Sequence, residues 1–238
     1  MSRHTIDITK EVVQSMTFSE EILEKSFDAT TNLYTYTLCD NHWLMECSFF
    51  EVASVRYKVE PPSDSTDPET QFRTEADLLV GDIVNGLPPA FQSGTPMQAQ
   101  NEVSQIADWK ERSPMAYLLE IIRENYNRQP TEKIDREANI FIYFVATLPE
   151  HGKIEDVRRR IVRPLTKMAQ AFIEKLGKNG SVIDNLLNEY TMTSFNRWGV
   201  YVDRQGTTAN IFPDMLGGVE IEINIPFRKD CPCKSCKK

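Results

Sequence analysis

Strict alternation of apolar and polar residues near the end of the sequence constrains the fold more than any other feature. In residues 219–227, valine, isoleucine or phenylalanine occupies every second position, and Glu220 and Glu222 are among the polar residues between them. A period of two places the apolar side chains on one face of an extended strand. We therefore predict a half-buried strand over residues 218–227 with Glu220 and Glu222 on its outer face.

A long helical pattern precedes this strand. Apolar residues recur at steps of three and four from Ile154 to Leu176, as in a helix that lies across a sheet. Pro164 lacks a backbone N–H and should bend this helix or split it in two. Gly177 marks its end. The residues from Phe195 to Val202 then predict another strand.

The middle of the chain contains two strongly apolar runs. Residues 139–147 are β-branched and aromatic without a polar face, which predicts a strand buried on both sides. Residues 114–124 fit either of two structures. Pro114 suits the first turn of a helix, yet the run is short and almost entirely apolar, as in a central strand.

The first part of the chain predicts a mixture of short elements. Residues 5–27 resemble an amphipathic helical pair, and residues 32–60 resemble short antiparallel strands. Prolines and short polar residues then interrupt the pattern. Residues 73–85 predict a helix with one apolar stripe, and residues 90–112 predict a long loop with a short helix at most.

These patterns predict an α+β fold. It comprises a mainly antiparallel sheet with the helices at 73–85 and 154–176 on one face, plus a small N-terminal helix and β module. The predicted division is as follows: an N-terminal module at 1–62, a linker at 63–72, an α+β domain at 73–230 and a tail rich in cysteine and lysine at 231–238.

Composition excludes several classes of protein. The 238 residues carry a net charge of −8, which argues against a surface that binds nucleic acid throughout. No apolar run is long enough to span a membrane, and the first residues lack the apolar segment of a signal peptide. We therefore expect the protein to stay in the compartment where it is made. Five cysteines do not suggest a secreted disulfide framework.

Catalytic and metal-binding motifs are weak. Cys231, Cys233 and Cys236 could hold zinc or copper, but a closed zinc site needs a fourth ligand. His4, His42 and His151 are widely separated, which does not favour an acid–base site. No P-loop, dinucleotide-binding or hydrolase motif occurs. We expect no enzyme activity, no cofactor and no bound metal.

Charge clusters are the better candidates for interaction. Arg158, Arg159 and Arg160 cannot all face solvent equally, because their neighbours in the helical stripe face the core. They form either a solvated face or a cationic contact with an acidic subunit or with DNA. Together with Glu220 and Glu222 they are our candidate subunit-contact residues.

Residues 70–227 resemble the tail terminator, tail-completion or neck proteins of tailed bacteriophages, including those of crAss-like phages. Six stretches carry the resemblance: GLPPAFQSGTP (86–96), SPMAYLLEIIREN (113–125), NIFIYFVATLPEH (139–151), RPLTKMAQAFI (163–173), FNRWGVY (195–201) and FPDMLGGVEIEINIPF (212–227). Such proteins are small α/β subunits that assemble as rings. The resemblance implies that residues 114–124 form a strand, and with their apolar character this decides the choice.

The resemblance also implies a function. It predicts a structural virion protein that forms a homo-oligomeric ring at the head–tail junction, assembled in the host bacterial cytoplasm. Its expected partners are portal, adaptor or tail proteins. The resemblance neither requires nor excludes contact with DNA that passes through the ring lumen. Residues 1–62 and the tail at 231–238 depart from the compact family form. The alternatives are a regulatory or interaction protein that binds metal through its cysteine-rich tail, and a small enzyme whose site comes from residues distant in sequence.

Overall fold

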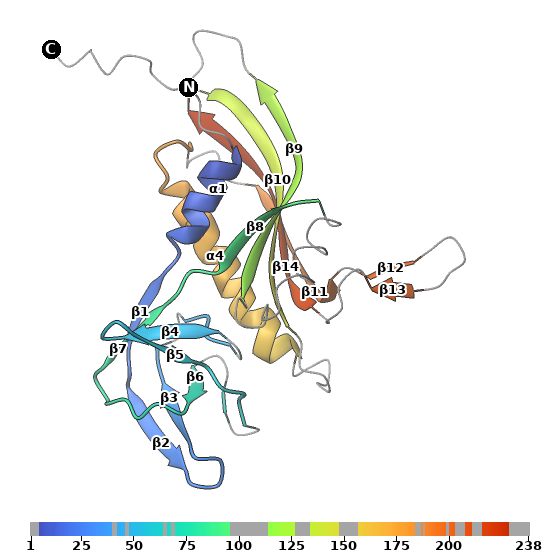
Figure 1. Cartoon of the computed structure of the whole chain (residues 1–238). Helices are drawn as coiled ribbons and strands as arrows, with labels where there is room; N and C mark the ends of the chain where they lie inside the picture. Colours follow the sequence, from blue (N-terminus) through green and yellow to red (C-terminus); the bar gives the residue numbers. More distant parts are fainter. Residues whose placement is uncertain are drawn as a thin grey trace, which may run out of the picture.

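A five-stranded sheet, built mostly from the second half of the chain, is the largest element of the fold (Figure 1). The computed structural model describes residues 5–39, 42–45, 48–63, 66–67, 70–95, 114–126, 134–147, 157–183, 187, 189–198, 200–202, 208–210 and 216–228. The helical elements are α1 (Thr5–Gln14), the π-helical turn η2 (Arg158–Val162) and α4 (Arg163–Gly177). The strands are β1 (Phe18–Glu21), β2 (Glu24–Asp28), β3 (Leu33–Thr37), β4 (Phe49–Val52), β5 (Val55–Lys58), β6 (Gln71–Thr74), β7 (Ile83–Gly86), β8 (Ala90–Gly94), β9 (Met115–Tyr126), β10 (Ile134–Thr147), β11 (Tyr190–Trp198), β12 (Val200–Val202), β13 (Thr208–Asn210) and β14 (Leu216–Arg228).

The main sheet has the strand order β11-β14-β10-β9-β8, and only the pair β8 and β9 is parallel. At its centre, Ile140 pairs with Ile223 and Ile142 pairs with Ile221, so apolar residues of neighbouring strands share one face. The predictions of strands at 114–124, 139–147 and 218–227 are confirmed. The α+β class with an antiparallel sheet is confirmed with them.

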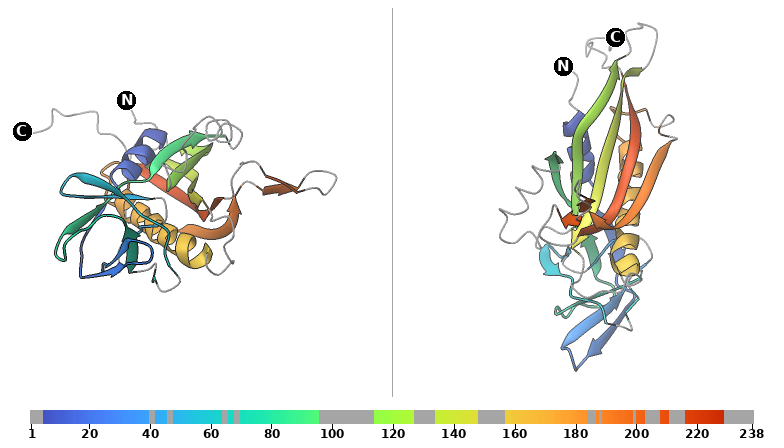
Figure 2. Two further views of the ribbon diagram at one scale, coloured as in Figure 1. Left: turned by 60° about the horizontal axis from the view of Figure 1, so that its bottom comes forward. Right: turned by 90° about the vertical axis from the view of Figure 1, so that its right-hand side faces the viewer.

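Helix α4 packs on the apolar face of this sheet. Its residues Leu165, Met168 and Phe172 are buried, and the helix contacts β10 and β14. The amphipathic helix α1 contacts α4 and β8, and Figure 2 shows α1 and α4 behind the strands of the main sheet. The predicted helix is confirmed from Val157 onward. Its first residues, 154–156, lie outside the described part.

The helix changes type near Pro164, where the sequence predicts a bend or a split. Pro164 occupies the first turn of α4, directly after the π-helical turn η2. Proline has no N–H to donate to a carbonyl in the preceding turn, so the regular ladder of helical hydrogen bonds is interrupted here. The α-helix continues from Arg163 and ends at Gly177, as expected.

The N-terminal module, which the structure extends to Gly86, contains two smaller sheets, ordered β1-β7-β4-β5 and β2-β3-β6. Its centre is aromatic: the ring of Phe72 lies 5.4 Å from that of Tyr36 and 4.9 Å from that of Phe50. β6 and β7 pair with strands that precede the predicted linker at 63–72. The predicted linker therefore does not separate the strands of one sheet from those of another, and the boundary is wrong in this respect. The separation of the chain into independent folding units stays a prediction.

Three predictions of secondary structure are wrong. The helical pair over 5–27 is a helix only to Gln14, and β1 and β2 follow it. The predicted helix at 73–85 is instead the end of β6, a turn and β7, so α4 has no helical neighbour from this segment. The predicted loop at 90–112 begins with strand β8, which pairs with β9, and residues 96–112 lie outside the described part.

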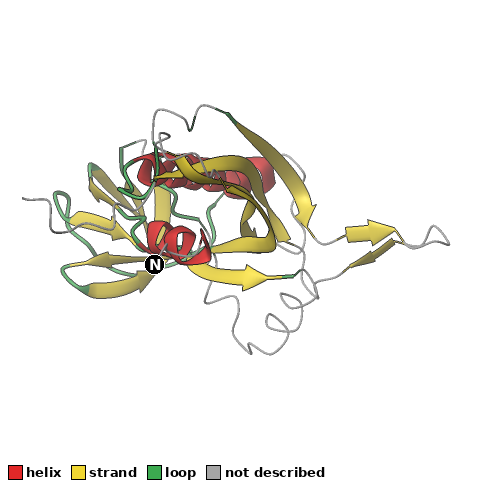
Figure 3. Ribbon diagram, turned by 90° about the horizontal axis from the view of Figure 1, so that it is seen from above, coloured by secondary structure: helices red, strands yellow, loops and turns green. Residues whose placement is uncertain are grey.

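One contiguous hydrophobic core joins the N-terminal module to the helix-covered face of the main sheet. A smaller cluster lies on the opposite face and contains Met115, Tyr117, Val145 and Leu216. The strands β12 and β13 pair with each other in a sheet of their own. Figure 3 shows this pair standing away from the rest of the molecule.

Candidate subunit-contact surfaces

Glu220 and Glu222 lie on the face of β14 that points away from α4, as the alternation predicts. Their neighbours in the strand, Val219 and Ile221, are completely buried, whereas both glutamates are only half-buried. Glu220 pairs across the ladder with Tyr143, and Glu222 pairs with Phe141. The glutamates are therefore set among aromatic residues of β10, and are less accessible than free surface carboxylates.

Both glutamates also have hydrogen-bond partners within the chain. The Nδ2 atom of Asn139 donates to Oε1 of Glu222 over 3.5 Å. Burial raises the pKa of Tyr143, and the hydrogen bond to Glu220 raises it further. Tyr143 thus stays a neutral donor to the carboxylate across the physiological range of pH.

The arginines Arg158, Arg159 and Arg160 form the turn η2 at the beginning of α4. Arg158 is exposed, while Arg159 and Arg160 are half-buried. An Nη2 donor of Arg159 bonds to the backbone oxygen of Thr66 over 3.3 Å, which ties η2 to the loop before β6. The three arginines therefore differ in role, and Arg158 is the one most accessible to a partner.

The predicted arginines and glutamates do not meet within one chain. The turn η2 contacts β14 and β11 from the helix-covered side of the sheet. Glu220 and Glu222 point to the other side, because they alternate with the buried residues that face α4. A contact between the two groups would have to join different copies of the chain, and it stays a prediction.

A buried charged cluster ties α1 to three strands of the main sheet. Arg136 is 4% exposed, and its Nε atom lies 3.6 Å from Oε1 of Glu124. Its guanidinium group also lies 4.7 Å from the centre of the Phe227 ring. The hydroxyl groups of Thr5 and Tyr126 both donate to the carboxylate of Glu124. A carboxylate beside the first residue of α1 also suits the positive end of the helix dipole.

Sequence reasoning missed this cluster, although a signal for it exists. Arg136 is in phase with Ala138, Ile140 and Ile142, which all face the core. A charged residue in phase with a buried face predicts a buried ion pair, because an unpaired buried charge is costly.

The N-terminal module has a comparable buried cation. Arg73 is 4% exposed, and its Nη2 atom lies 3.3 Å from Oδ2 of Asp28 and 2.6 Å from Oγ1 of Thr31. Hydrogen bonds from Thr31 and the backbone of Thr30 lower the pKa of Asp28. These contacts fix the β2–β3 turn to strand β6, so they are structural.

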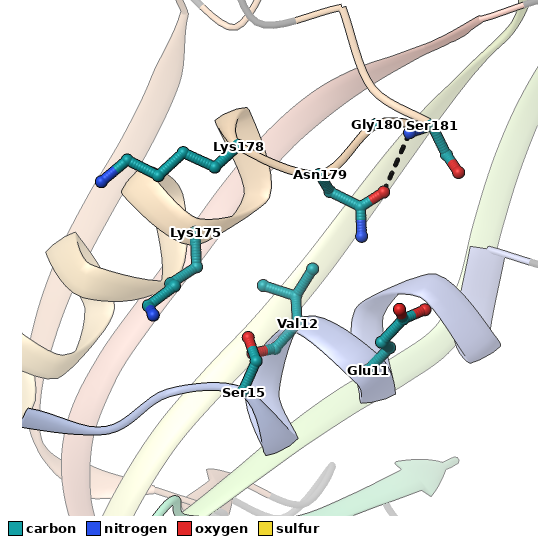
Figure 4. A pocket seen from close by; sticks show the side chains of 8 residues that line it. All are labelled: Glu11, Val12, Ser15, Lys175, Lys178, Asn179, Gly180 and Ser181. Carbon is teal, nitrogen blue, oxygen red and sulfur yellow. Dashed lines mark hydrogen bonds between the residues drawn. The ribbon is translucent and has the colours of Figure 1, made fainter.

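A polar cavity of about 440 Å³ lies between α1 and the end of α4 (Figure 4). Lys175 of α4 and its C-cap residue Lys178 line it, and Glu11 of α1 and Ser15, directly after α1, lie across from them. The Oδ1 atom of Asn179 accepts a hydrogen bond of 3.0 Å from the backbone N–H of Ser181. Lysines at the end of a helix interact favourably with its dipole, which accounts for both of them without a ligand.

His42 is buried, and Cys39 is exposed with a free thiol. Across the part of the chain that the structure describes, no group of three or more His, Cys, Asp or Glu could hold a metal ion. Within the same residues, no helix is long and apolar enough to cross a membrane. The candidate residues His4, His151, Cys231, Cys233 and Cys236 lie outside the described residues.

No protein-family model and no curated protein matches this sequence.

Proposed function

We propose that this chain is a structural virion protein of a tailed bacteriophage. In this proposal it forms an oligomeric ring at the head–tail junction, as a neck or tail terminator protein, and docks to portal, adaptor or tail components. It is assembled in the host bacterial cytoplasm, and DNA passes through the lumen of the ring. The proposal assigns the chain no catalytic role and no cofactor.

The open edges of the main sheet carry this proposal. β11 and β8 are the outermost strands in the order β11-β14-β10-β9-β8, so among the described strands each lacks a partner on one side. Unpaired backbone N–H and C=O groups at a sheet edge favour pairing with another chain. In a closed ring, such edges could join across every subunit boundary.

The strand pair β12–β13 supports the same proposal. It forms its own two-stranded sheet and extends away from the body (Figures 1 and 3). An isolated two-stranded hairpin is only marginally stable in water. In the proposed ring, a neighbouring subunit packs against this hairpin.

The two faces of the main sheet differ, and from them we also propose how the subunits are oriented in the ring. α4 and α1 lie behind the main sheet, and its other face carries the small cluster around Tyr117 with the half-buried Glu220 and Glu222. We propose that subunits are arranged with their helices on one side of the ring wall. Arg158, Arg159 and Arg160 remain candidates for contact with a neighbouring subunit, and Glu220 and Glu222 remain candidates on the opposite face.

Negative-stain electron microscopy of the purified full chain tests the proposal. We expect ring-shaped particles of uniform diameter, either alone or after addition of a portal or tail-tube protein. A chain that stays monomeric at high concentration, and forms no particle with such partners, would contradict it. Stoichiometric zinc in the purified protein would instead favour metal binding by the cysteine-rich tail.

A further inference from the structure

The N-terminal module exposes an unusual set of large apolar side chains. Leu79 is 67% exposed, Val80 58%, and Ile83 and Leu23 47% each. Two backbone hydrogen bonds hold their segments together, from Gly81 N to Ile22 O at 2.9 Å and from Ile22 N to Asp82 O at 3.0 Å. Contiguous apolar residues that are this exposed commonly mark a protein interaction site.

Acidic residues surround these apolar side chains. The two segments at 20–24 and 75–83, which we call the acidic corner, contain six carboxylates and no lysine or arginine. Glu21, Glu24 and Glu75 are exposed. Among the described residues, Asp77 is paired to a cation, since Lys25 of β2 donates to it and thereby lowers its pKa. The partner of this corner should therefore combine an apolar surface with positive charge.

The same chain carries a surface of that description. Residues 158–167, which we call the arginine segment, contain five cations and no acid. Arg158 and Arg163 are exposed. Long arginine side chains also present apolar stems, against which leucine and valine can pack. In Figure 1, β7 of the corner lies at the left of the molecule, and the beginning of the gold helix lies to the right of it, below the main sheet.

We propose that the acidic corner of one copy binds the arginine segment of the next copy. Two different surfaces on different sides of a subunit give a head-to-tail contact, which closes into a ring when the rotation between copies allows it. Copies with a net charge of −8 repel each other in most orientations, and this orientation brings opposite charges together. This inference rests on the proposed function and names the contact that builds the ring. It assigns the arginines to the corner rather than to Glu220 and Glu222, which are half-buried and hydrogen-bonded within their own chain.

Mixing two defective variants tests the head-to-tail arrangement. The variant Leu79→Ser/Val80→Ser/Glu21→Lys blocks the corner, and Arg158→Glu/Arg163→Glu blocks the arginine segment. Each variant alone should be monomeric in sedimentation velocity, with Kd for self-association raised about tenfold or more. Their mixture keeps one intact pair of surfaces per two chains, so it should form a dimer and nothing larger. Circular dichroism checks that each variant is folded.

The control is Val55→Ser, because Val55 is 51% exposed on β5 and belongs to neither the acidic corner nor the arginine segment. It should assemble like the wild type. A second arm measures the wild type at rising salt, where we expect weaker assembly because exposed charges are screened.

The outcomes separate the inference from the function. If the wild type forms rings and both variants also do, the inference is wrong and the proposed function stands. If folded variants are monomeric but their mixture stays monomeric, the contact is not between these two surfaces. A wild-type chain that is monomeric alone but joins rings with other virion proteins overturns only the inference. A chain that assembles under neither condition overturns both.

Discussion

Replacing Gly218 with alanine tests the pairing of the two central strands of the main sheet. Gly218 of β14 lies opposite Val145 of β10. A Cβ atom at this position would lie 2.1 Å from the backbone oxygen of Phe144, whereas ordinary contacts begin at 3.4 Å. The difference, 3.4 minus 2.1, requires a local separation of the strands by about 1.3 Å.

The cost of this separation follows from the atoms involved. The close neighbour is backbone within the sheet, so it cannot rotate away as a side chain would. Overpacking typically costs about 1–3 kcal/mol. Weakened ladder hydrogen bonds add about 0.5–1.5 kcal/mol each. We expect Gly218→Ala to lower the free energy of unfolding by about 3 kcal/mol, which is about 6–12 °C in Tm for a chain of this size.

Urea unfolding followed by circular dichroism provides the assay, with Gly180→Ala as the control. A Cβ atom at Gly180 meets nothing within 4 Å, so this change should alter stability by less than about 0.5 kcal/mol. If the two alanine variants are equally stable, β10 and β14 are not paired in the register described here.

Three further changes probe the core, a hydrogen bond and a buried charge. Phe172 is fully buried with its ring 5.7 Å from that of Phe144, so Phe172→Ala should cost about 3–5 kcal/mol in thermal or urea unfolding. Tyr143→Phe should cost about 0.5–1.5 kcal/mol at pH 7. Because the pKa of folded Tyr143 is raised above its ordinary value of 10.0, its contribution is complete below pH 10 and is lost at higher pH. The difference between Tyr143→Phe and wild type should therefore shrink in unfolding measurements above pH 10. Glu124→Gln should cost about 3 kcal/mol, because it leaves the buried charge of Arg136 without its carboxylate.

Each of these predictions has an outcome that contradicts it. Exposed Phe27 is the control for the first, and equal losses for Phe27→Ala and Phe172→Ala would mean that α4 does not pack on the sheet. If the difference in unfolding free energy between Tyr143→Phe and wild type stays constant as the pH rises above 10, the raised pKa of Tyr143 does not contribute to stability. A harmless Glu124→Gln would show that Arg136 is satisfied by other groups.

The parts of the fold that the sequence predicts well are those with a long and regular pattern. The alternation around Ile221 and Ile223 extends along a single strand, and the stripe from Val157 to Leu176 extends along the continuous helical segment formed by η2 and α4. In both cases one buried face determines the spacing of the apolar residues, so the pattern can be read without knowledge of distant partners.

The N-terminal half shows why the rest could not be predicted. Leu79, Val80 and Ile83 fit a helical stripe, yet all three are exposed, and Val84 is buried in a strand. Gly81 has a positive φ of 95°, and the side chain of Asp82 accepts a hydrogen bond from Leu79 N, so this segment is a turn. β7 is then fixed by pairing with β1, more than sixty residues earlier in the chain. Such long-range pairing leaves little trace in one sequence.

The charged residues divide in the same way. Alternation correctly places Glu220 and Glu222 on the face away from α4. It does not reveal that Tyr143 and Asn139 on the adjacent strand bind these carboxylates, because that depends on the register between β10 and β14. The acidic corner could not be predicted, because its sequence pattern indicates a different structure. Its apolar residues look like the core of a helix until the structure places them at the surface.

Native mass spectrometry of the purified full chain tests self-assembly most directly. We predict a discrete oligomer with a single number of copies, which loses subunits as ammonium acetate concentration rises and is absent for Arg158→Glu/Arg163→Glu. A wild-type spectrum that contains only the monomer, at every concentration and with virion partners present, would contradict the central claim.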